Sequence, residues 1–335
     1  MESTVEALLS TGKGILAADE SLSTIEKRFK AQGIESTEAH RRAYREMLFT
    51  TAGIGEYISG VILFDETIRQ RSTAGIPLQE VLASQGIIPG IKVDKGTVAL
   101  ASFPGEKVTE GLDGLRERLA EYRGFGARFT KWRAVIGIGA HIPTHTCIKA
   151  NAQALAHFAA FSQEAGLVPI VEPELLMNGS HSLRRSEEVA SALLKDVFNT
   201  LVEHRVVLEH MLLKTSMIVS GSECPEQADE SAVAETTLRC LRRGVPAAVP
   251  GIVFLSGGQE DEVATERLNA ICRAGPAPWT LSFSFGRALQ AATLRLWKGS
   301  SINVPAAQEA LRHRARCNSA AARGRYSAMM EHAQA

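Results

Sequence analysis

Eight short apolar segments recur along the chain, and they alternate with longer stretches whose apolar residues repeat with helical spacing. Each apolar segment is bounded by polar residues or glycines, which is typical of a buried β-strand. Strands that alternate with helices predict parallel βαβ connections. The predicted strands are residues 14–19, 60–65, 87–94, 127–135, 167–175, 211–220, 251–258 and 279–286.

Eight such units closing on themselves form a (β/α)8 barrel, and 335 residues suit one barrel domain. The alternative is an open doubly wound sheet. No GxGxxG motif follows the first predicted strand, so a dinucleotide-binding fold is less favoured. The segments of helical character between the strands include residues 37–50, 113–122, 148–164, 186–203, 231–242 and 261–272.

The C-terminal part of the sequence predicts one additional helix, at residues 305–318, followed by a short tail. No segment rich in Pro, Gly or Ser divides the chain before that point. We therefore expect a single barrel domain over residues 1–318. The small and polar residues 319–335 should form a mobile C-terminal tail.

The composition excludes several classes of protein. The 37 Lys and Arg residues balance 37 Asp and Glu residues, and this argues against a nucleic-acid partner or an anionic membrane surface. The longest apolar run, residues 245–255, is far shorter than the roughly 20 residues of a membrane-spanning helix. The first residues carry no basic and apolar leader, and the five cysteines form no CxxC pair. We therefore expect reduced thiols and a cytoplasmic protein.

Charged residues interrupt the apolar segments near their C-terminal ends. Residues two apart on one strand point to the same face of the sheet. Active sites of (β/α)8 barrels lie at the C-terminal ends of the strands, so we expect these side chains to meet in one mouth. The charged residues are Asp19, Lys92 and Asp94, Lys131 and Arg133, Glu172 and Glu174, and Lys214.

Each of these charges also has an ordinary structural explanation. A single lysine at a strand end commonly extends its ammonium group into solvent. The pair Glu172 and Glu174 equally fits a solvated strand terminus. The functional interpretation gains weight because several strands carry charges at the same end. Burying an unpaired charge costs several kcal/mol, so a fold tolerates many only where they pair or perform chemistry.

Lys214 is the strongest candidate nucleophile because apolar residues surround it in the sequence. A lysine with an ordinary pKa of about 10.4 is protonated at neutral pH and reacts poorly. An apolar wall and a nearby cation favour the neutral amine, and Lys131 is the candidate cation. The neutral amine can form a Schiff base with a ketone, and the iminium then accepts electrons from a breaking carbon–carbon bond. Asp19, Glu172 and Glu174 are candidates for moving the protons.

Two turns at the ends of the last two strands predict a phosphate site. Residues 254–258 (FLSGG) end the seventh strand with two glycines, whose backbone N–H groups can approach an anion. Residues 284–287 (SFGR) end the eighth strand and begin a helix, adding a helix N-terminus and a guanidinium group. An ordinary turn explains either motif alone, whereas phosphate sites after strands seven and eight recur in barrel enzymes.

The predicted mouth carries more cations than anions. Six cations (Arg28, Lys92, Lys131, Arg133, Lys214 and Arg287) face four anions (Asp19, Asp94, Glu172 and Glu174). A phosphate monoester carries a charge of about −1.5 to −2 at neutral pH. The excess of positive charge therefore suits a substrate with two phosphate groups.

Metal chemistry is the main alternative to the lysine nucleophile. Nine histidines are scattered, and His141 and His145 form the one close pair. Pro143 between them breaks the helix that an HExxH-type site requires. No P-loop and no GxSxG motif is present. We expect no metal and no cofactor.

Seven motifs occur in order: residues 12–21 (GKGILAADES), 60–64 (GVILF), 90–96 (GIKVDKG), 131–133 (KWR), 168–174 (VPIVEPE), 212–214 (LLK) and 254–259 (FLSGGQ). Together they closely resemble the class I fructose-bisphosphate aldolases, from about residue 5 to about residue 326. The resemblance implies a metal-independent (β/α)8 lyase of glycolysis and gluconeogenesis, usually a homotetramer. Such an enzyme cleaves fructose 1,6-bisphosphate reversibly to dihydroxyacetone phosphate and glyceraldehyde 3-phosphate.

The resemblance also implies roles for individual residues. Lys214 matches the Schiff-base lysine, and Glu172 matches the acid and base that forms and dehydrates the carbinolamine. Lys131 would assist that step, Asp19 would handle the C4 hydroxyl proton, and Glu174 would support them. Ser256, Gly257, Ser284, Gly286 and Arg287 match the 1-phosphate site. Ser21, Thr24, Arg28, Lys92 and Arg133 match contacts around the other end of the substrate.

The sequence departs from the family pattern at four places. The chain ends without the terminal Tyr that helps to protonate the enamine in many members, Thr215-Ser216 replaces Pro-Asn, Phe285 replaces Tyr, and Thr24 replaces Ser. The change at Thr24 keeps a hydroxyl donor. We hypothesise that Glu172 or a water-relayed group protonates the enamine.

Two alternatives to this function stay open at this stage. The barrel could serve as a binding scaffold without activity, although every expected catalytic position in the barrel is retained. The imine chemistry could also act on another ketose phosphate. A mouth with cations at both ends favours a bisphosphate.

Overall fold

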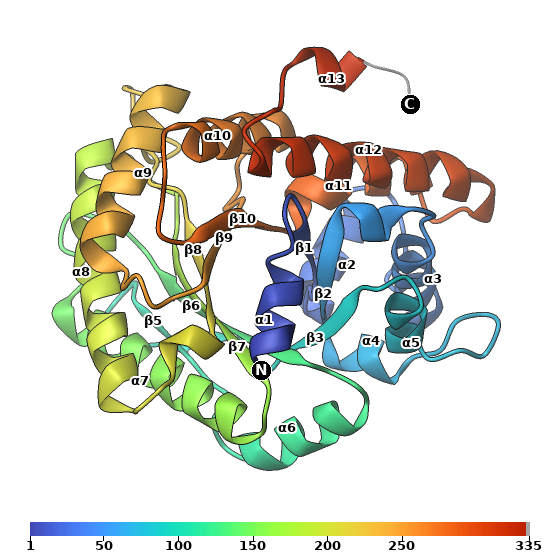
Figure 1. Ribbon diagram of the computed structural model, residues 1–335, viewed down its shortest axis with the longest axis horizontal. Helices are drawn as coiled ribbons and strands as arrows, with labels where there is room; N and C mark the ends of the chain where they lie inside the picture. Colours follow the sequence, from blue (N-terminus) through green and yellow to red (C-terminus); the bar gives the residue numbers. More distant parts are fainter. Residues whose placement is uncertain (333–335) are drawn as a thin grey trace.

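The computed structural model describes residues 1–332 and has the predicted architecture: eight parallel strands form a closed barrel, with helices around it (Figure 1). The order around the barrel is β1-β10-β9-β8-β7-β6-β3-β2, so the first strand pairs with the last. The barrel strands are β1 (Gly14–Ala18), β2 (Ile58–Leu63), β3 (Ile88–Lys92), β6 (Phe129–Ile136), β7 (Val168–Leu175), β8 (Leu212–Ser216), β9 (Gly251–Leu255) and β10 (Thr280–Phe285).

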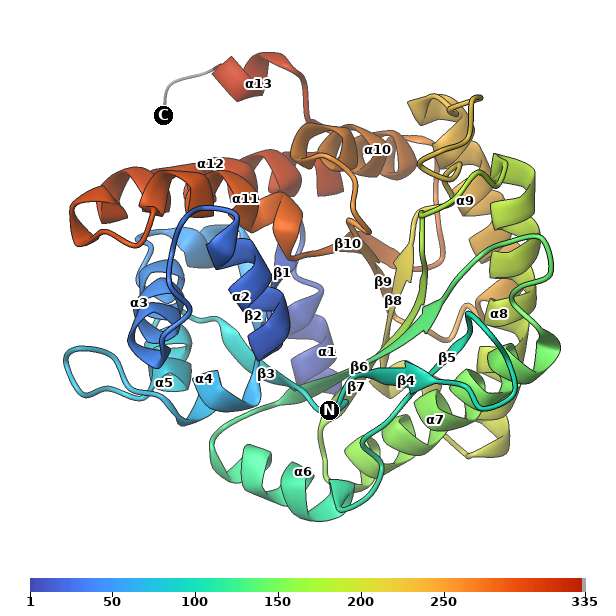
Figure 2. The ribbon, with the colours of Figure 1, turned by 180° about the vertical axis from the view of Figure 1, so that it is seen from behind.

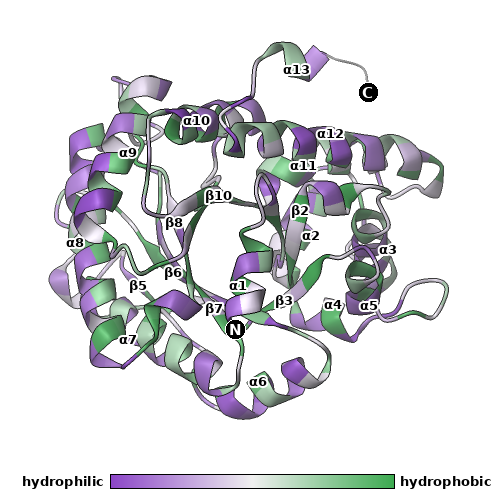
Figure 3. Ribbon diagram, in the orientation of Figure 1, coloured by the Kyte–Doolittle hydropathy of each residue, from purple (hydrophilic) through white to green (hydrophobic). Residues whose placement is uncertain are grey.

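The helices bury their apolar faces against the strands, while hydrophilic residues predominate on their outer surfaces (Figure 3). Three 3-10 turns, η1 (Ile54–Glu56), η2 (Leu208–His210) and η3 (Ser301–Asn303), lie in the connections. The helices are α1 (Glu2–Leu8), α2 (Leu22–Lys30), α3 (Glu38–Phe49), α4 (Asp65–Arg69), α5 (Leu78–Ala83), α6 (Leu115–Gly124), α7 (His145–Glu164), α8 (Leu183–Glu203), α9 (Glu230–Gly244), α10 (Asp261–Arg273), α11 (Arg287–Trp297), α12 (Val304–Ala322) and α13 (Met329–His332).

The N-terminal end of the barrel is closed by α1, which lies across it in Figure 1. Val5 and Leu8 of this helix are buried and belong to a separate apolar cluster inside the barrel. The hydroxyl group of Ser59 donates a hydrogen bond to the carbonyl oxygen of Leu8 at 2.7 Å and ties the helix to β2. The strand residues in this cluster are Ile15, Ala17, Ile62, Phe129, Val168, Ile170, Leu212 and Val253.

Glycine makes room for the largest side chain in this interior cluster. A Cβ atom on Gly90 would lie 2.3 Å from the ring of Phe129, and a Cβ atom on Gly60 would lie 3.1 Å from it. Both distances are too short for ordinary contacts, so β2 and β3 need glycine where the ring of Phe129 packs. The interior of the barrel is therefore a filled core below the mouth.

Several predicted boundaries differ from the observed ones, and local chemistry explains the differences. The helix expected at 148 begins at His145 because the side chain of Thr144 accepts a hydrogen bond from the N–H of Cys147. The strand expected to reach residue 258 ends at Leu255. Gly257 and Gly258, with φ of 55° and 98°, turn the chain there.

Some elements carried too little sequence signal to be predicted. They include α1 and the antiparallel hairpin of β4 (Thr97–Ala99) and β5 (Lys107–Thr109).

The last long helix, predicted to end at residue 318, continues to Ala322. After it, Tyr326 is buried, and α13 follows before the end of the described chain. Residues 333–335 of the predicted mobile tail lie outside the described residues.

Candidate active site

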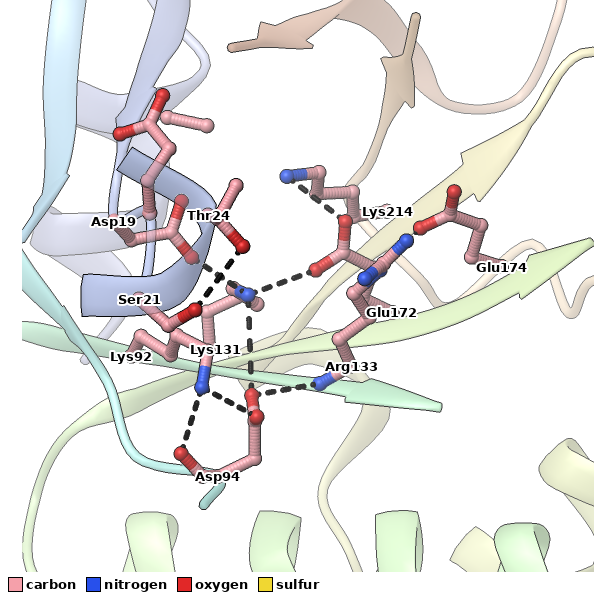
Figure 4. A network of polar contacts seen from close by, with 12 residues as sticks. Asp19, Ser21, Thr24, Lys92, Asp94, Lys131, Arg133, Glu172, Glu174 and Lys214 are labelled. Carbon is pink, nitrogen blue, oxygen red and sulfur yellow. Dashed lines mark hydrogen bonds and ion pairs between the residues drawn. The ribbon is translucent and has the colours of Figure 1, made fainter. Parts of the chain in front are cut away.

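All fifteen residues that the sequence singled out as catalytic or binding line one cavity of about 1300 Å³ at the C-terminal end of the barrel strands. Figure 2 views the molecule from behind Figure 1, and Figure 4 shows the polar network within the mouth. The structure therefore brings together side chains from β3, β6, β7, β8 and β10 and from the turns and helices that follow β1, β9 and β10.

Lys131 lies at the centre of the polar network (Figure 4). Its Nζ atom is 2.7 Å from a carboxylate oxygen of Asp19, 3.2 Å from Glu172 and 3.9 Å from Asp94. The side chain is 3% exposed, so these charges interact with little screening by water. Three carboxylates around one ammonium group hold that group in a single position.

The pair formed by Lys214 and Glu172 follows directly from strand register. Leu212 of β8 is paired with Ile170 of β7, and in a parallel pair the residues two further along are also neighbours. Nζ of Lys214 accordingly lies 2.9 Å from Oε1 of Glu172, and both side chains are buried. The sequence predicted a neighbouring cation for Lys214, whereas the nearest charged group in the structure is this carboxylate.

Arg133 and Glu174 form the next pair outward along β6 and β7. The Nε–H group of Arg133 donates to a carboxylate oxygen of Glu174. The backbone N–H of Arg133 also donates to Asp94 at 3.2 Å. The side chain of Arg133 is 41% exposed, so its charge faces the open part of the mouth.

The network fixes the protonation states of its members. Burial alone would raise the pKa of Asp19 and of Glu172, but the charges of Lys131 and Lys214 outweigh it and lower both pKa values below their ordinary ranges. Burial alone would lower the pKa of Lys131. The carboxylates of Asp19, Glu172 and Asp94 outweigh that effect and raise its pKa. Both carboxylates are therefore ionised, and Lys131 is positively charged, at neutral pH.

Glu20 organises the loop after β1, a role that the sequence analysis missed. Its buried carboxylate accepts hydrogen bonds from Arg45 at 2.6 Å, from Gln290 at 3.0 Å and from Arg28. Gln290 also donates to the carbonyl oxygen of Ala17, so the same network holds the end of β1. The sequence shows a carboxylate directly after Asp19, but two of its partners, Arg45 and Gln290, lie 25 and 270 residues away.

One end of the cavity has the features expected of a phosphate site. Gly258 and Arg287 approach each other closely, since a Cβ atom on Gly258 would lie 3.0 Å from the guanidinium of Arg287. Arg287 is the first residue of α11. In the described part of the chain, the buried hydroxyl of Ser284 makes no hydrogen bond, and it lines this cavity. Backbone N–H groups, a helix N-terminus and a guanidinium group thus converge.

Another part of the cavity, lined by the segment after β1 and by β3, carries hydroxyl and basic groups. The hydroxyl groups of Ser21 and Thr24 lie 3.0 Å apart. Nζ of Lys92 lies 2.5 Å from the carboxylate of Asp94, and Arg28 is paired with Glu20. Taken over all its lining residues, the cavity has nine Lys or Arg against six Asp or Glu. The predicted excess of positive charge is therefore present, although several of its members are paired.

Residues that could hold a metal ion lie elsewhere. Among residues 1–332, one group of three His, Cys or acidic side chains has donor atoms within 4.8 Å of one another, on α12 and α13 outside the cavity. His145 lies 3.5 Å from Asp196 with its side chain 71% exposed.

All five cysteines are free thiols. No helix among the described residues is long and apolar enough to span a membrane.

A closed (β/α)8 barrel with buried lysines and carboxylates paired in its C-terminal mouth defines a barrel enzyme with lysine and carboxylate chemistry. The family model described as "Fructose-bisphosphate aldolase class-I" matches residues 1–335. The chain belongs to the class I fructose-bisphosphate aldolase family, whose members are lyases.

Relatives and a solved structure agree with this assignment. A probable fructose-bisphosphate aldolase class 1 of Xanthomonas campestris is 56% identical over 96% of this chain and 97% of that relative. The cytoplasmic isozyme 2 of the pea (Pisum sativum) aldolase is 53% identical over 94% of this chain and 88% of that relative. The structure of the Plasmodium falciparum aldolase, in complex with TRAP and a small-molecule inhibitor, matches with a TM-score of 0.96 and 48% identity over 97% of this chain and 94% of that one.

Proposed function

We propose that this chain cleaves fructose 1,6-bisphosphate reversibly to dihydroxyacetone phosphate and glyceraldehyde 3-phosphate through a Schiff base on Lys214. The observation that carries the proposal is the buried pair of Lys214 and Glu172, 2.9 Å apart in a cationic mouth. One proton transfer within this pair converts an ammonium and a carboxylate into an amine and a carboxylic acid. The nucleophile is thereby formed without a change in net charge.

The pair supplies both protons that imine formation requires. The neutral amine of Lys214 attacks the ketone carbon, and the carbinolamine then loses its hydroxyl group as water after Glu172 has protonated it. Lys131 lies 3.2 Å from the second oxygen of Glu172 and keeps that side chain in place. Its positive charge also favours the return of Glu172 to the carboxylate form.

Bond cleavage requires a base at the C4 hydroxyl group. When the C3–C4 bond breaks, its electron pair moves into the iminium to give an enamine, and the C4 hydroxyl proton leaves as the aldehyde forms. Asp19 suits this step because it is ionised and lies across Lys131 from Glu172. Glu174 acts by holding Arg133 at the mouth.

The two ends of the cavity bind the two phosphate groups in this proposal. Ser256, Gly257, Ser284, Gly286 and Arg287 receive the 1-phosphate. Ser21, Thr24, Arg28, Lys92 and Arg133 receive the other end of the substrate. Arg28 and Lys92 are already paired with Glu20 and Asp94, so the incoming phosphate competes with these carboxylates. Comparing kcat/KM for fructose 1,6-bisphosphate and fructose 1-phosphate tests the two-ended site, and the bisphosphate should be preferred.

Enamine protonation falls to Glu172, once it has regained a proton from water after the dehydration step, or to a water that it orients. Tyr326, the last tyrosine of the chain, donates its hydroxyl hydrogen to Glu331 at 2.9 Å and does not line the cavity. Removal of residues 321–335 should therefore leave the rate of tritium release from labelled dihydroxyacetone phosphate nearly unchanged. A severe loss would identify the tail as the proton donor.

Borohydride reduction in the presence of dihydroxyacetone phosphate tests the central step. We expect a stable adduct on the peptide that contains Lys214, no adduct in Lys214→Met, and full activity in EDTA. Activity that is lost in EDTA, without an adduct, would indicate a metal-dependent aldolase instead.

We further propose a cytoplasmic homotetramer. The free thiols and the names of the plant relatives support the compartment. Light scattering coupled to size-exclusion chromatography should give four times the 36.1 kDa mass of one chain. A mass of one or two chains would contradict the tetramer.

A further inference from the structure

A second cluster of reactive side chains lies on the outside of the barrel, where the C-terminal segment returns to α12 (Figure 1). His313 and Cys317 are four residues apart on α12 and therefore lie on the same face of that helix. Glu331 on α13 reaches the same point. None of these three residues lines the cavity in the mouth.

The donor atoms of the cluster have the separations of a tetrahedral zinc site. Nε2 of His313 lies 3.0 Å from Oε2 of Glu331, and Sγ of Cys317 lies 3.7 Å from the same nitrogen. All three donor atoms lie within 4.8 Å of one another. Zinc bonds of 2.0–2.3 Å at the tetrahedral angle place nitrogen and oxygen about 3.3 Å apart, and nitrogen and sulfur about 3.6 Å apart. Movements of a few tenths of an ångström would complete this geometry.

We propose that His313, Cys317 and Glu331 bind one Zn²⁺ ion, with water as the fourth ligand. An imidazole nitrogen, a thiolate and a carboxylate are the three ligand types that zinc uses in proteins. Binding releases the thiol proton of Cys317 to solvent. The side chain of His313 is 22% exposed, which gives the ion and its water a way in, whereas Cys317 is fully buried.

The groups around Glu331 orient it as a zinc ligand. The hydroxyl of Tyr326 donates to Oε1 at 2.9 Å, and the guanidinium of Arg314 donates to both carboxylate oxygens at 2.6 Å. With zinc on Oε2, Arg314 and Tyr326 keep Oε1. Thiolate and carboxylate then balance the two charges of the ion, while Arg314 stays close to other acceptors, Thr265 and the carbonyl of Asp261. Such supporting contacts orient the ligands of metal sites.

Zinc at this position would cross-link α12 to α13. Without the ion, the described C-terminal segment is held mainly through the contacts of Glu331 and the buried ring of Tyr326. Arg323 and Arg325 lie between the two ligand-bearing helices and are exposed. The ion should therefore protect this connection from trypsin, without altering turnover in the distant mouth.

Cobalt and zinc titrations of the full chain test the proposal. Co²⁺ should give a thiolate-to-cobalt charge-transfer band with tetrahedral d–d bands at one equivalent, and excess Zn²⁺ should abolish them. Cys317→Ser should remove the charge-transfer band, and His313→Ala should weaken zinc binding more than about 100-fold. Cys272→Ser is the matched control, since it removes another thiol outside the cluster, and it should leave the band unchanged.

These outcomes distinguish a zinc site from a C-terminal segment that is held by the ion pairs of Glu331 alone. An absent band in the unaltered chain, or a band that persists in Cys317→Ser, would overturn the proposal. Equal trypsin cleavage after Arg323 and Arg325 with and without Zn²⁺ would also overturn it. Circular dichroism of each variant establishes that it is folded before its metal affinity is compared. Loss of the zinc site leaves the Schiff-base test on Lys214 unaffected, so the two proposals fail independently.

Discussion

The two ends of the barrel are built from the same strands and yet differ completely in chemistry. At the N-terminal end, Ile170 and Leu212 pack with Leu8 in an apolar cluster without a charged side chain. Two residues further along the same strands, Glu172 and Lys214 form a buried ion pair. One step of two residues, about 7 Å along each strand, therefore separates the core of the barrel from its reactive mouth.

This comparison shows that the two ends depend on different physical quantities. At the N-terminal end, stability depends on how well the side-chain volumes fit together, because Phe129 packs directly over Gly60 and Gly90. In the mouth, the arrangement of the buried side chains depends on paired charges, because each buried ammonium faces at least one carboxylate. Substitutions at the N-terminal end should therefore change stability with little effect on kcat, whereas substitutions in the mouth should act chiefly on kcat.

The largest effect is expected for Lys214→Met. Methionine keeps the length of the side chain but removes the proposed nucleophile, so kcat should fall by about 10⁴-fold or more. Steady-state cleavage of fructose 1,6-bisphosphate measures this loss, and the midpoint of urea unfolding monitors stability. A variant that retains more than a tenth of the kcat would refute the assignment of Lys214.

Leu8→Ala should produce the opposite pattern. Leu8 is fully buried at the N-terminal end, and removal of its isobutyl group leaves a cavity among Ile15, Phe129 and Ile170. The free energy of unfolding should fall by about 3 kcal/mol. The kcat should stay within twofold of the original value. A large loss of kcat without a loss of stability would mean that the two ends are coupled.

Gly90→Ala tests whether the fit of side-chain volumes at the N-terminal end depends on a single close contact. The new methyl group would meet the ring of Phe129 at 2.3 Å, and overpacking of this kind costs about 2 kcal/mol. The double variant Gly90→Ala with Phe129→Leu should recover part of that loss in urea unfolding. A double variant that is less stable than the sum of the two single changes predicts would show that the contact between residue 90 and the ring of Phe129 does not cause the loss of stability.

The smallest expected effect is a pH dependence that belongs to the mouth alone. The pKa of Glu172 is lowered in the folded state, so its contribution to stability is present above its unfolded pKa of about 4.3 and is lost as the pH falls through the folded value. The destabilisation caused by Glu172→Gln should therefore be constant from about pH 5 to 8 and shrink on acidification below about pH 4. The destabilisation caused by Leu8→Ala should not change over this range, because the N-terminal cluster contains no titratable side chain.

The fold could be predicted to the level of the barrel because its signals are local and repeated. The eight apolar segments follow from the environment of a parallel strand covered on two faces, and the charges at their C-terminal ends mark the open mouth of the barrel. The helix α1 could not be predicted, since seven residues give too short a pattern for assigning a helix that depends on burial of Val5 and Leu8. The three-residue strands β4 and β5 show no detectable alternation either.

The membership of the site could be predicted, whereas its pairing could not. Lys131, Glu172 and Lys214 are visible as charges at strand ends. Which carboxylate pairs with which lysine depends on the register between strands, and register arises from the closure of the whole barrel. Glu20 was missed for the same reason, because Gln290, one of its partners, is 270 residues away.

The pairing of β1 with β10 sets a condition on the synthesis of the chain. Residues Ile15 and Leu16 meet Ser284 and Phe285, so the first strand waits for its neighbour until almost the whole polypeptide has left the ribosome. During that time β1 offers an unpaired edge to any other nascent strand. An elongation pause placed before codon 280 should therefore lengthen this interval and raise the share of newly made chains that aggregate.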